Sequence, residues 1–205
     1  MGVAERRARE KEVLRSQILT AASELFVAEG VQSVSMRRIA EKIEYAPSTI
    51  YLYFKDKEEL LHTICREVFE ELTAILAEIH SRGLAPLDQL RAGLRAYVDF
   101  GLEHPNHYLL VFGPAMYEEV PGEPSPEDVA GVKAFDQLRQ TIQYGISTGA
   151  IRQADVDVLS QTIWMMLHGI TDLLIISKDV PNFPWADQES VISCGLDAII
   201  QSVRP

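Results

Sequence analysis

The chain has 205 residues, of which 47% are hydrophobic and 24% are charged, and its net charge is −11. This composition excludes a disordered chain, and 12 glycines and 10 prolines exclude a collagen-like or low-complexity protein. The length supports one domain or two small ones, and two cysteines without zinc-ligand spacing predict no disulfide framework and no structural zinc site. The chain contains no P-loop and no G-x-G-x-x-G motif, and we expect neither a metal nor a cofactor.

Apolar residues recur at helical spacing along the whole chain, which predicts an all-α fold. The first helix covers about residues 8–29 and ends at Gly30. Ser35 is a good N-cap for a short helix, Pro47 suits the first turn of a second one, and Asp56 caps a long helix that ends near 82–86. Later helices are expected at about 87–103, 105–117, 126–147, 155–178 and 187–203, with loops at 118–127 and 179–186.

The last two expected helices are apolar on more than one side. Such helices in a small chain bury their second face, and a matching helix pair on a second copy is one solution. A helix that is fully internal to one subunit is the alternative. The candidate dimer interface consists of Ile170, Leu173, Leu174, Ile192, Leu196, Ile199 and Ile200.

The most apolar stretch, residues 163–176, is shorter than the roughly 18 residues that a membrane span needs. The polar, charged start of the chain is unlike a signal peptide. We therefore expect a soluble, cytoplasmic protein with no membrane partner.

Charge is unevenly distributed along the chain. Residues 1–55 carry 9 Lys and Arg against 7 Asp and Glu, whereas residues 56–205 carry 10 against 23. This division suits a DNA-facing first part and an acidic body, although small imbalances are common in proteins.

Residues 30–60 form two short helices, a tight turn between them and a charged junction into the long helix. This is the helix-turn-helix arrangement, in which the second helix enters the DNA major groove. Hydroxyl side chains at its start suit phosphates or base edges, and a lysine in the first turn of the next helix suits an anion. A helical hairpin with solvated charges has the same spacing. The candidate DNA-binding residues are Ser35, Arg37, Arg38, Tyr45, Pro47, Ser48, Thr49, Tyr51, Tyr53 and Lys57.

The same segment resembles the N-terminal domain of the TetR (tetracycline repressor) family of bacterial transcription regulators. The residues that carry the resemblance are Gly30, Ile39-Ala40, Thr49-Ile50-Tyr51, Tyr53-Phe54 and Lys57-Glu58-Glu59-Leu60, with Leu25-Phe26 upstream. The resemblance implies a three-helix DNA-binding domain at 1–55, joined by a long helix to a helical ligand-binding and dimerisation domain at 56–205. It also implies a homodimer that binds a palindromic operator, represses transcription and is released by a small-molecule inducer.

Three positions depart from the family pattern. Val34 replaces the usual Thr, so Ser35 must cap the first short helix. Glu44 replaces the usual turn Gly and would be strained by about 1 kcal/mol if its φ is positive. Ala46 replaces the usual Ser cap of the recognition helix, and Tyr45 is the expected compensating DNA contact.

The C-terminal half resembles a narrower group whose C-terminal domain is named for a Trp-His-Gly motif, here Trp164, His168 and Gly169. In the TetR family the ligand lies among these helices. The candidate pocket residues are Tyr97, Phe100, His104, Tyr108, Phe112, Met116, Phe135, Leu138, Trp164, Met165 and His168. Aromatic residues and methionines at helical spacing are also typical of an ordinary core, and they suggest a hydrophobic or aromatic inducer.

Two features admit other functions. The basic start, about residues 1–11, is either an arm along or into the DNA minor groove or a disordered terminus. Glu59 and His62 have the Glu-x-x-His spacing of helical di-iron enzymes, but the further ligands such a site requires are missing. An acidic helical adaptor that binds protein partners is the remaining alternative, and DNA affinity distinguishes it from a regulator. We expect no enzyme activity.

Overall fold

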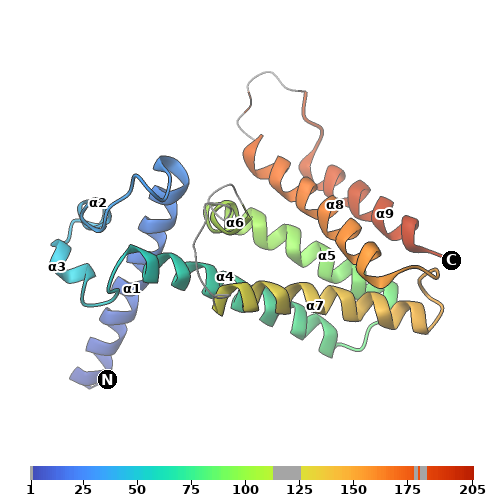
Figure 1. Cartoon of the computed structure of the whole chain (residues 1–205), viewed down its shortest axis with the longest axis horizontal. Coiled ribbons are helices and arrows are strands. Elements are labelled where there is room, and N and C mark those ends of the chain that lie inside the picture. The colour runs from blue at the N-terminus through green and yellow to red at the C-terminus, as the bar shows by residue number, and fades with distance from the viewer. Residues whose placement is uncertain (1, 113–125, 178–179, 181–183) are drawn as a thin grey trace. The chain divides into compact units, whose positions relative to one another are not determined.

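The structure, a computed structural model, describes residues 2–112, 126–177, 180 and 184–205 (Figure 1). Within these ranges the regular structure is helical, which confirms the predicted all-α class. The helices are α1 Val3–Glu29, α2 Met36–Lys42, α3 Pro47–Ile50, α4 Lys57–Ser81, α5 Pro86–Glu103, α6 Pro105–Phe112, α7 Pro126–Ser147, α8 Val156–Ile176 and α9 Gln188–Val203. Met116, most of the expected loop 118–127 and half of the expected loop 179–186 lie outside the described residues.

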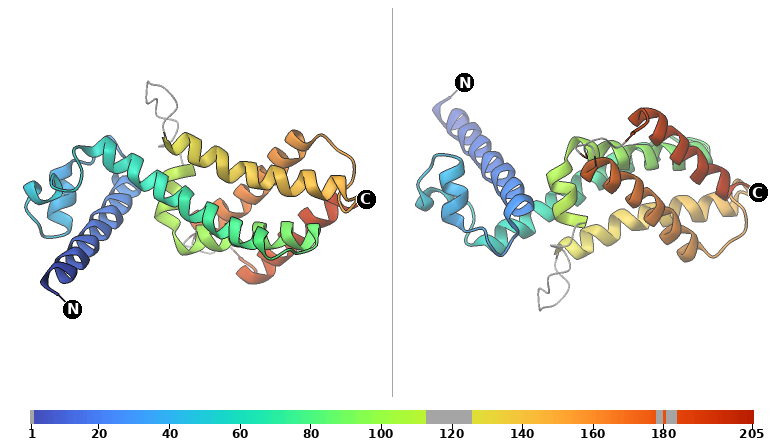
Figure 2. Two further views of the ribbon diagram at one scale, coloured as in Figure 1. Left: turned by 90° about the horizontal axis from the view of Figure 1, so that it is seen from below. Right: turned by 90° about the horizontal axis from the view of Figure 1, so that it is seen from above.

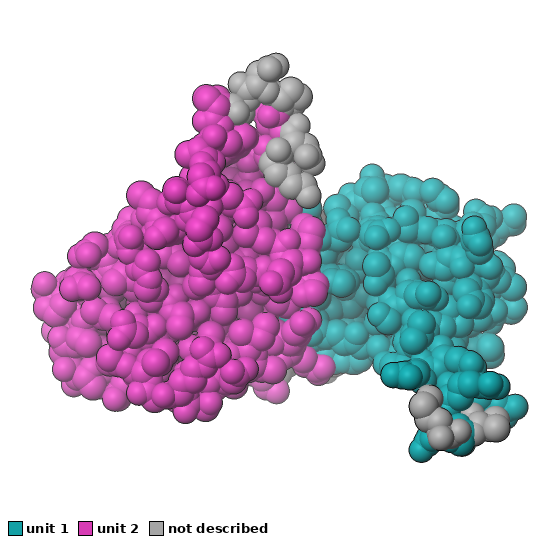
Figure 3. Space-filling view, turned by 180° about the vertical axis from the view of Figure 1, so that it is seen from behind, with its two compact units in different colours: residues 1–68, 106–127 teal, residues 69–105, 128–205 magenta. Residues whose placement is uncertain are grey.

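The chain divides into two compact units (Figure 3). One consists of residues 1–68 and 106–127, and the other of residues 69–105 and 128–205. Helix α4 supplies residues to both units, because the division falls between Val68 and Phe69.

The core of the first unit forms on one face of α1. Ile18, Ala22 and Phe26 are buried there, together with Ile39 of α2 and Ile50 of α3. These positions on α1 recur every four residues, so their side chains lie on one side of the helix. Helix α1 contacts α2, and α2 contacts α3, which brings together the three elements of the predicted helix-turn-helix domain.

Helix α1 begins at Val3, five residues before its predicted start. Alanine, glutamate and arginine, all good helix formers, dominate its first turns. The side chain of Glu5 accepts a hydrogen bond from the backbone N–H of Gly2 at 2.7 Å, and Arg6 pairs with Glu10 at 3.5 Å. The basic start is therefore helical, so a disordered terminus is the wrong alternative.

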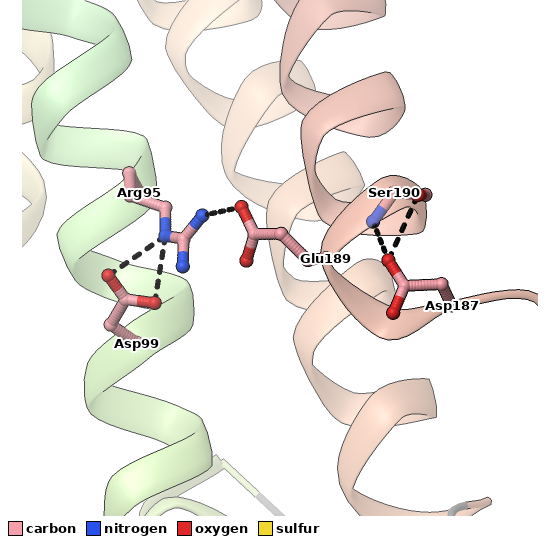
Figure 4. Close-up of polar contacts among 5 residues, drawn as sticks. All are labelled: Arg95, Asp99, Asp187, Glu189 and Ser190. Carbon is pink, nitrogen blue, oxygen red and sulfur yellow. Dashed lines mark hydrogen bonds and ion pairs between the residues drawn. The ribbon is translucent and has the colours of Figure 1, made fainter.

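The core of the second unit joins α5, α8 and α9, which contact one another pairwise. Helices α8 and α9 start where the side chains of Asp155 and Asp187 accept backbone hydrogen bonds. Gly195 lets α9 approach α8 closely, since a Cβ there would lie 2.8 Å from Cδ1 of Ile170. Arg95 of α5 bonds Asp99 on its own helix and Glu189 at the start of α9 (Figure 4).

Four of the seven candidate dimer-interface residues belong to this core. Ile192, Leu196, Ile199 and Ile200 are at most 5% exposed within the single chain, so their prediction as a surface for a partner is wrong. The apolar face of α9 packs against α5 and α8 of its own chain. Leu173 is 54% exposed, whereas Ile170 and Leu174 are half-buried.

Helix α8 is long and apolar enough to cross a membrane by length and composition. The expectation from the sequence rested only on the apolar stretch 163–176. The helix in the structure is longer, because it already begins at Val156. One side of α8 buries Leu159, Ile163 and Leu167 against its neighbours, as a packing helix of a globular core does.

Candidate nucleic-acid interface

Ser35 caps α2, as the sequence predicted. Its Oγ accepts a hydrogen bond from the backbone N–H of Arg38 at 3.2 Å, while its own backbone is extended. This bond satisfies one of the N–H groups that a helix start leaves without a partner. The cap at Ser35 thus replaces the threonine that the family pattern places at Val34.

The turn between α2 and α3 has a left-handed residue. Glu44 has φ 61°, and among the described residues it alone combines a side chain with a positive φ. The turn closes through a hydrogen bond from the N–H of Tyr45 to the carbonyl oxygen of Ala40 at 3.0 Å. A side chain in this conformation costs roughly 1–2 kcal/mol. The strain anticipated at Glu44 is therefore present, and its carboxylate is exposed.

Helix α3 is a single turn that begins at Pro47, and no side chain caps it at Ala46. Ile50 is fully buried and anchors the turn to the core. Pro47 and Ser48 are exposed, and Thr49 is half-buried. Side chains on the outer side of this turn are therefore available to a partner.

The residues that flank α3 add large side chains to the same surface. Tyr45 is 45% exposed and Tyr51 is 54% exposed, while Tyr53 is half-buried. Leu52 is 77% exposed, more than any other large hydrophobic residue that the structure describes. Leu52 was not among the residues that the sequence selected as candidates. Leu52 is two residues after the buried Ile50, which corresponds to about 200° around a helix, and this spacing indicates that the Leu52 side chain faces solvent.

Lys57 has a structural partner that its sequence position did not reveal. Its Nζ donates hydrogen bonds to the carbonyl oxygens of Val31 at 2.6 Å and Gln32 at 3.3 Å. These bonds tie the start of α4 to the segment that follows α1. Asp56 caps α4, as predicted, by accepting a hydrogen bond from the N–H of Glu59 at 2.8 Å, and this bond lowers the pKa of Asp56.

Acidic partners hold both arginines of α2. Arg37 pairs with Glu41 at 3.0 Å on the same helix, and Arg38 pairs with Glu29 of α1 at 3.0 Å. The hydrogen bond that Arg38 donates to the carboxylate of Glu29 raises the pKa of Arg38. Ion pairs this exposed are screened by solvent and stabilise the fold only weakly, so a phosphate can compete for either guanidinium.

Two cations of α1 lie over consecutive aromatic rings that follow α3. The guanidinium carbon of Arg15 is 5.7 Å from the centre of the Phe54 ring, and Nζ of Lys11 is 5.9 Å from the centre of the Tyr53 ring. Arg15 also pairs with Glu67. Cation–π contacts at such distances are favourable by about 0.5–1 kcal/mol at exposed sites. We call α3 and the residues that follow it up to Phe54 the recognition segment. The two contacts place one face of α1 beside the end of this segment.

The second unit brings four candidate ligand residues together from α5, α7 and α8. Tyr97 Oη lies 3.3 Å from Nδ1 of His168, whose ring stacks on Trp164 with centroids 5.7 Å apart. Phe135 meets Trp164 edge-on at 6.2 Å. Burial lowers the pKa of His168, so its neutral form is favoured. This aromatic cluster, Tyr97, Phe135, Trp164 and His168, has the residue types of a small-molecule site and equally those of a packed core.

The other ligand candidates are distributed differently. Phe100 is buried beside His104, with ring centroids 5.2 Å apart, and Leu138 is half-buried. Tyr108 and Phe112 belong to the first unit, where their rings lie 4.9 Å apart.

Met165 is 60% exposed, so its prediction as a pocket residue is wrong for the single chain. Met165 follows Trp164 by one residue, so its side chain is rotated by about 100° around α8 and points away from the cluster.

The residues of the alternative metal-enzyme hypothesis have other partners. The side chain of Glu59 accepts a hydrogen bond from the backbone N–H of Lys55, and His62 lies 3.7 Å from Glu58. In the described part of the chain, no group of three or more His, Cys, Asp or Glu residues is placed to hold a metal ion.

Two family models match the chain. "Bacterial regulatory proteins, tetR family" matches residues 18–64, and "Tetracyclin repressor-like, C-terminal domain" matches residues 90–184. The regulator TcmR of Streptomyces glaucescens is 34% identical over 82 residues, which is 40% of this chain and 36% of that protein. An uncharacterised helix-turn-helix regulator of Haemophilus influenzae is 41% identical over 63 residues, or 31% of this chain and 34% of that one. The chain thus spans about a third of the length of these two curated relatives.

Solved structures share the fold over nearly the whole chain. The TetR family regulator PfmR of Thermus thermophilus is 20% identical with a TM-score of 0.72, covering 90% of this chain and 97% of its own. The ketosteroid regulator KstR2 of Mycobacterium tuberculosis is 18% identical with a TM-score of 0.74, covering 93% and 95%. At these identities the likeness concerns the fold.

Proposed function

This chain belongs to the TetR family of bacterial regulatory proteins, and we propose that it is a DNA-binding transcriptional regulator that acts as a homodimer on a palindromic operator and responds to a small molecule. The observation that carries the proposal is the helix-turn-helix of the first unit. Buried Ile50 anchors α3 there, while Ser48, Tyr51 and Leu52 remain available on the outside. The function requires no catalytic step, and its DNA partner places the protein in the cytoplasm.

In this proposal the exposed residues around α3 divide by their chemistry. Ser48 and Thr49 bond phosphates or base edges, and the hydroxyls of Tyr51 and Tyr53 bond phosphates. Leu52 offers apolar contact to a thymine methyl group, the apolar feature that the major groove presents. Ser35, Arg37, Arg38, Tyr45, Pro47 and Lys57 complete the proposed surface and set its register on the DNA backbone.

The experiment is selection of DNA by the full-length protein from a random duplex library, followed by binding to the selected duplex and a scrambled duplex at two salt concentrations. We expect tight binding that prefers the selected duplex, with two subunits per site or a multiple of two. Weak binding to both duplexes that disappears with salt would contradict the proposal and favour an acidic adaptor for protein partners.

An exposed apolar stripe on α8 supports the homodimer. Val158, Met165, Met166, Leu173 and Ile176 are each at least 41% exposed on this helix. Contiguous apolar surface of this kind is typical of a protein–protein interface. Dimerisation would set the distance between two recognition segments, and half-sites one DNA turn apart require about 34–36 Å.

The aromatic cluster of the second unit supports the ligand response. Its four side chains come from three helices, so a hydrophobic or aromatic inducer among them would change the packing of α5, α7 and α8. Helix α4 has residues in both units and is the proposed lever. Crystals with and without inducer should differ in the separation of the recognition segments, and equal separation with equal flexibility would contradict the lever.

The sign of regulation is open to a direct test. A repressor lowers transcription from a reporter that carries the selected duplex, and inducer restores it. One relative, FasR of Mycolicibacterium smegmatis, is named a transcriptional activator and is 30% identical over 99 residues. Higher transcription in the presence of the protein would make this chain an activator.

A further inference from the structure

The first turns of α1 extend into solvent. Residues 4–13 are all exposed, and Leu14 is the first residue after them that is buried. In Figures 1 and 2 these turns extend beyond α2 and α3 of the same unit. Burial therefore does not explain why this part of the chain carries charged side chains in a regular arrangement.

One face of this extension is basic. Arg7, Lys11 and Arg15 are four residues apart, so they form a single row along α1. Arg15 lies over Phe54 and Lys11 lies over Tyr53, which places the row beside the end of the recognition segment. Arg7 is one turn further toward the N-terminus, past the aromatic pair.

The row has an energetic cost in the free protein. Like charges four residues apart on a helix repel each other and destabilise it. Arg15 is compensated by Glu67 and Glu12, and Glu10 is three residues after Arg7, whereas no acidic residue is three or four residues from Lys11. A polyanion along the row would turn this repulsion into attraction.

We propose that the basic row of α1, Arg7 and Lys11, binds the phosphate backbone of operator DNA next to the segment that α3 contacts. The inference rests on the proposed function, and it concerns a contact outside the helix-turn-helix. A helix is about 10–12 Å wide with its side chains, and the minor groove is about 6 Å wide, so this helical extension lies along phosphates and does not enter that groove. Such contacts add affinity and salt dependence without sequence preference.

The test compares two matched double variants of the full-length protein. R7A/K11A removes both cations of the row, and R6A/R9A removes two cations from the opposite face of the same turns, where Arg6 pairs with Glu10. Both variants lose the same charge and gain alanine, the best helix former. Circular dichroism verifies equal helicity, and binding is measured on the library-selected duplex and on its scrambled counterpart across a salt series.

We expect R7A/K11A to bind both duplexes at least about tenfold more weakly, with the same preference between them. Its plot of log affinity against log salt should lose a slope of about 3.6 per dimer, about 0.9 for each of the four phosphate contacts that the two subunits lose. R6A/R9A should bind as the wild type does. Equal loss in both variants, or no loss in R7A/K11A, would overturn the inference while the wild type still binds selectively. A wild type without selective binding would instead overturn the proposed function.

Discussion

Glu44 concentrates two unfavourable features of the interface in one residue, a φ of 61° and an exposed carboxylate beside the proposed DNA surface. We expect Glu44→Gly to raise the free energy of unfolding by about 1 kcal/mol, because glycine adopts this conformation without a steric cost. We also expect tighter DNA binding, since a negative charge leaves the surface. Urea unfolding and operator titration measure the two effects.

Glu44→Gln is the control that separates strain from charge. It removes the carboxylate and retains a side chain at positive φ, so DNA binding should tighten while the free energy of unfolding stays unchanged. If Glu44→Gly alone tightened binding, turn geometry and not charge would be responsible.

Tyr51 and Lys57 are both proposed phosphate contacts, and they differ in what else they hold. Tyr51→Phe should weaken DNA binding evenly across sequences without changing stability, because the ring is 54% exposed.

Lys57→Ala should weaken binding and also lower the free energy of unfolding by about 1 kcal/mol, since two carbonyl oxygens lose their donor. Binding to several operator variants, with urea unfolding, tests both. A loss that concentrates at one base pair would show that the residue reads sequence.

At the scale of an element, α8 has two apolar sides with different surroundings. One side packs within the chain, and the other presents the exposed stripe that includes Met166 and Leu173. We expect the double variant M166D/L173D to be monomeric, because dimerisation would bury two charges without partners. Light scattering after size-exclusion chromatography measures the mass of each species.

Val132→Asp is the matched control for this prediction. Val132 is 60% exposed on α7, so the substitution also converts an exposed apolar side chain to a charge. It should leave the dimer intact. A dimeric M166D/L173D protein would mean that another surface forms the interface.

At the scale of the whole molecule, the acidic excess lies after residue 55, where 10 Lys and Arg face 23 Asp and Glu. Self-repulsion among these charges destabilises the fold, and salt screens it. Raising salt from about 0.05 to about 0.2 M should therefore raise the melting temperature while it weakens DNA binding by more than tenfold. Thermal unfolding and operator titration in the same buffers compare the two. A melting temperature that falls with salt would show that the ion pairs outweigh the repulsion.

Helix boundaries followed from the sequence because their signals are local. Ser35 and Asp56 cap the helices that they were predicted to cap, Pro47 begins α3, and Gly30 ends α1 with φ 82°. Each of these residues acts on backbone groups a few positions away, so no knowledge of distant contacts is needed. The start of α1 was predicted too late, because the first residues of this helix have a high helix propensity but no apolar face. Such a sequence also fits a solvated arm.

Only the tertiary structure decided which surfaces are covered. Periodicity shows that α8 and α9 have apolar faces, but it does not show that Ile199 meets its own chain while Leu173 remains exposed. It likewise does not reveal that Lys57 bonds a carbonyl oxygen 26 residues earlier. A pattern in sequence specifies the direction of a side chain around its own helix, and the partner on that side depends on how distant helices pack.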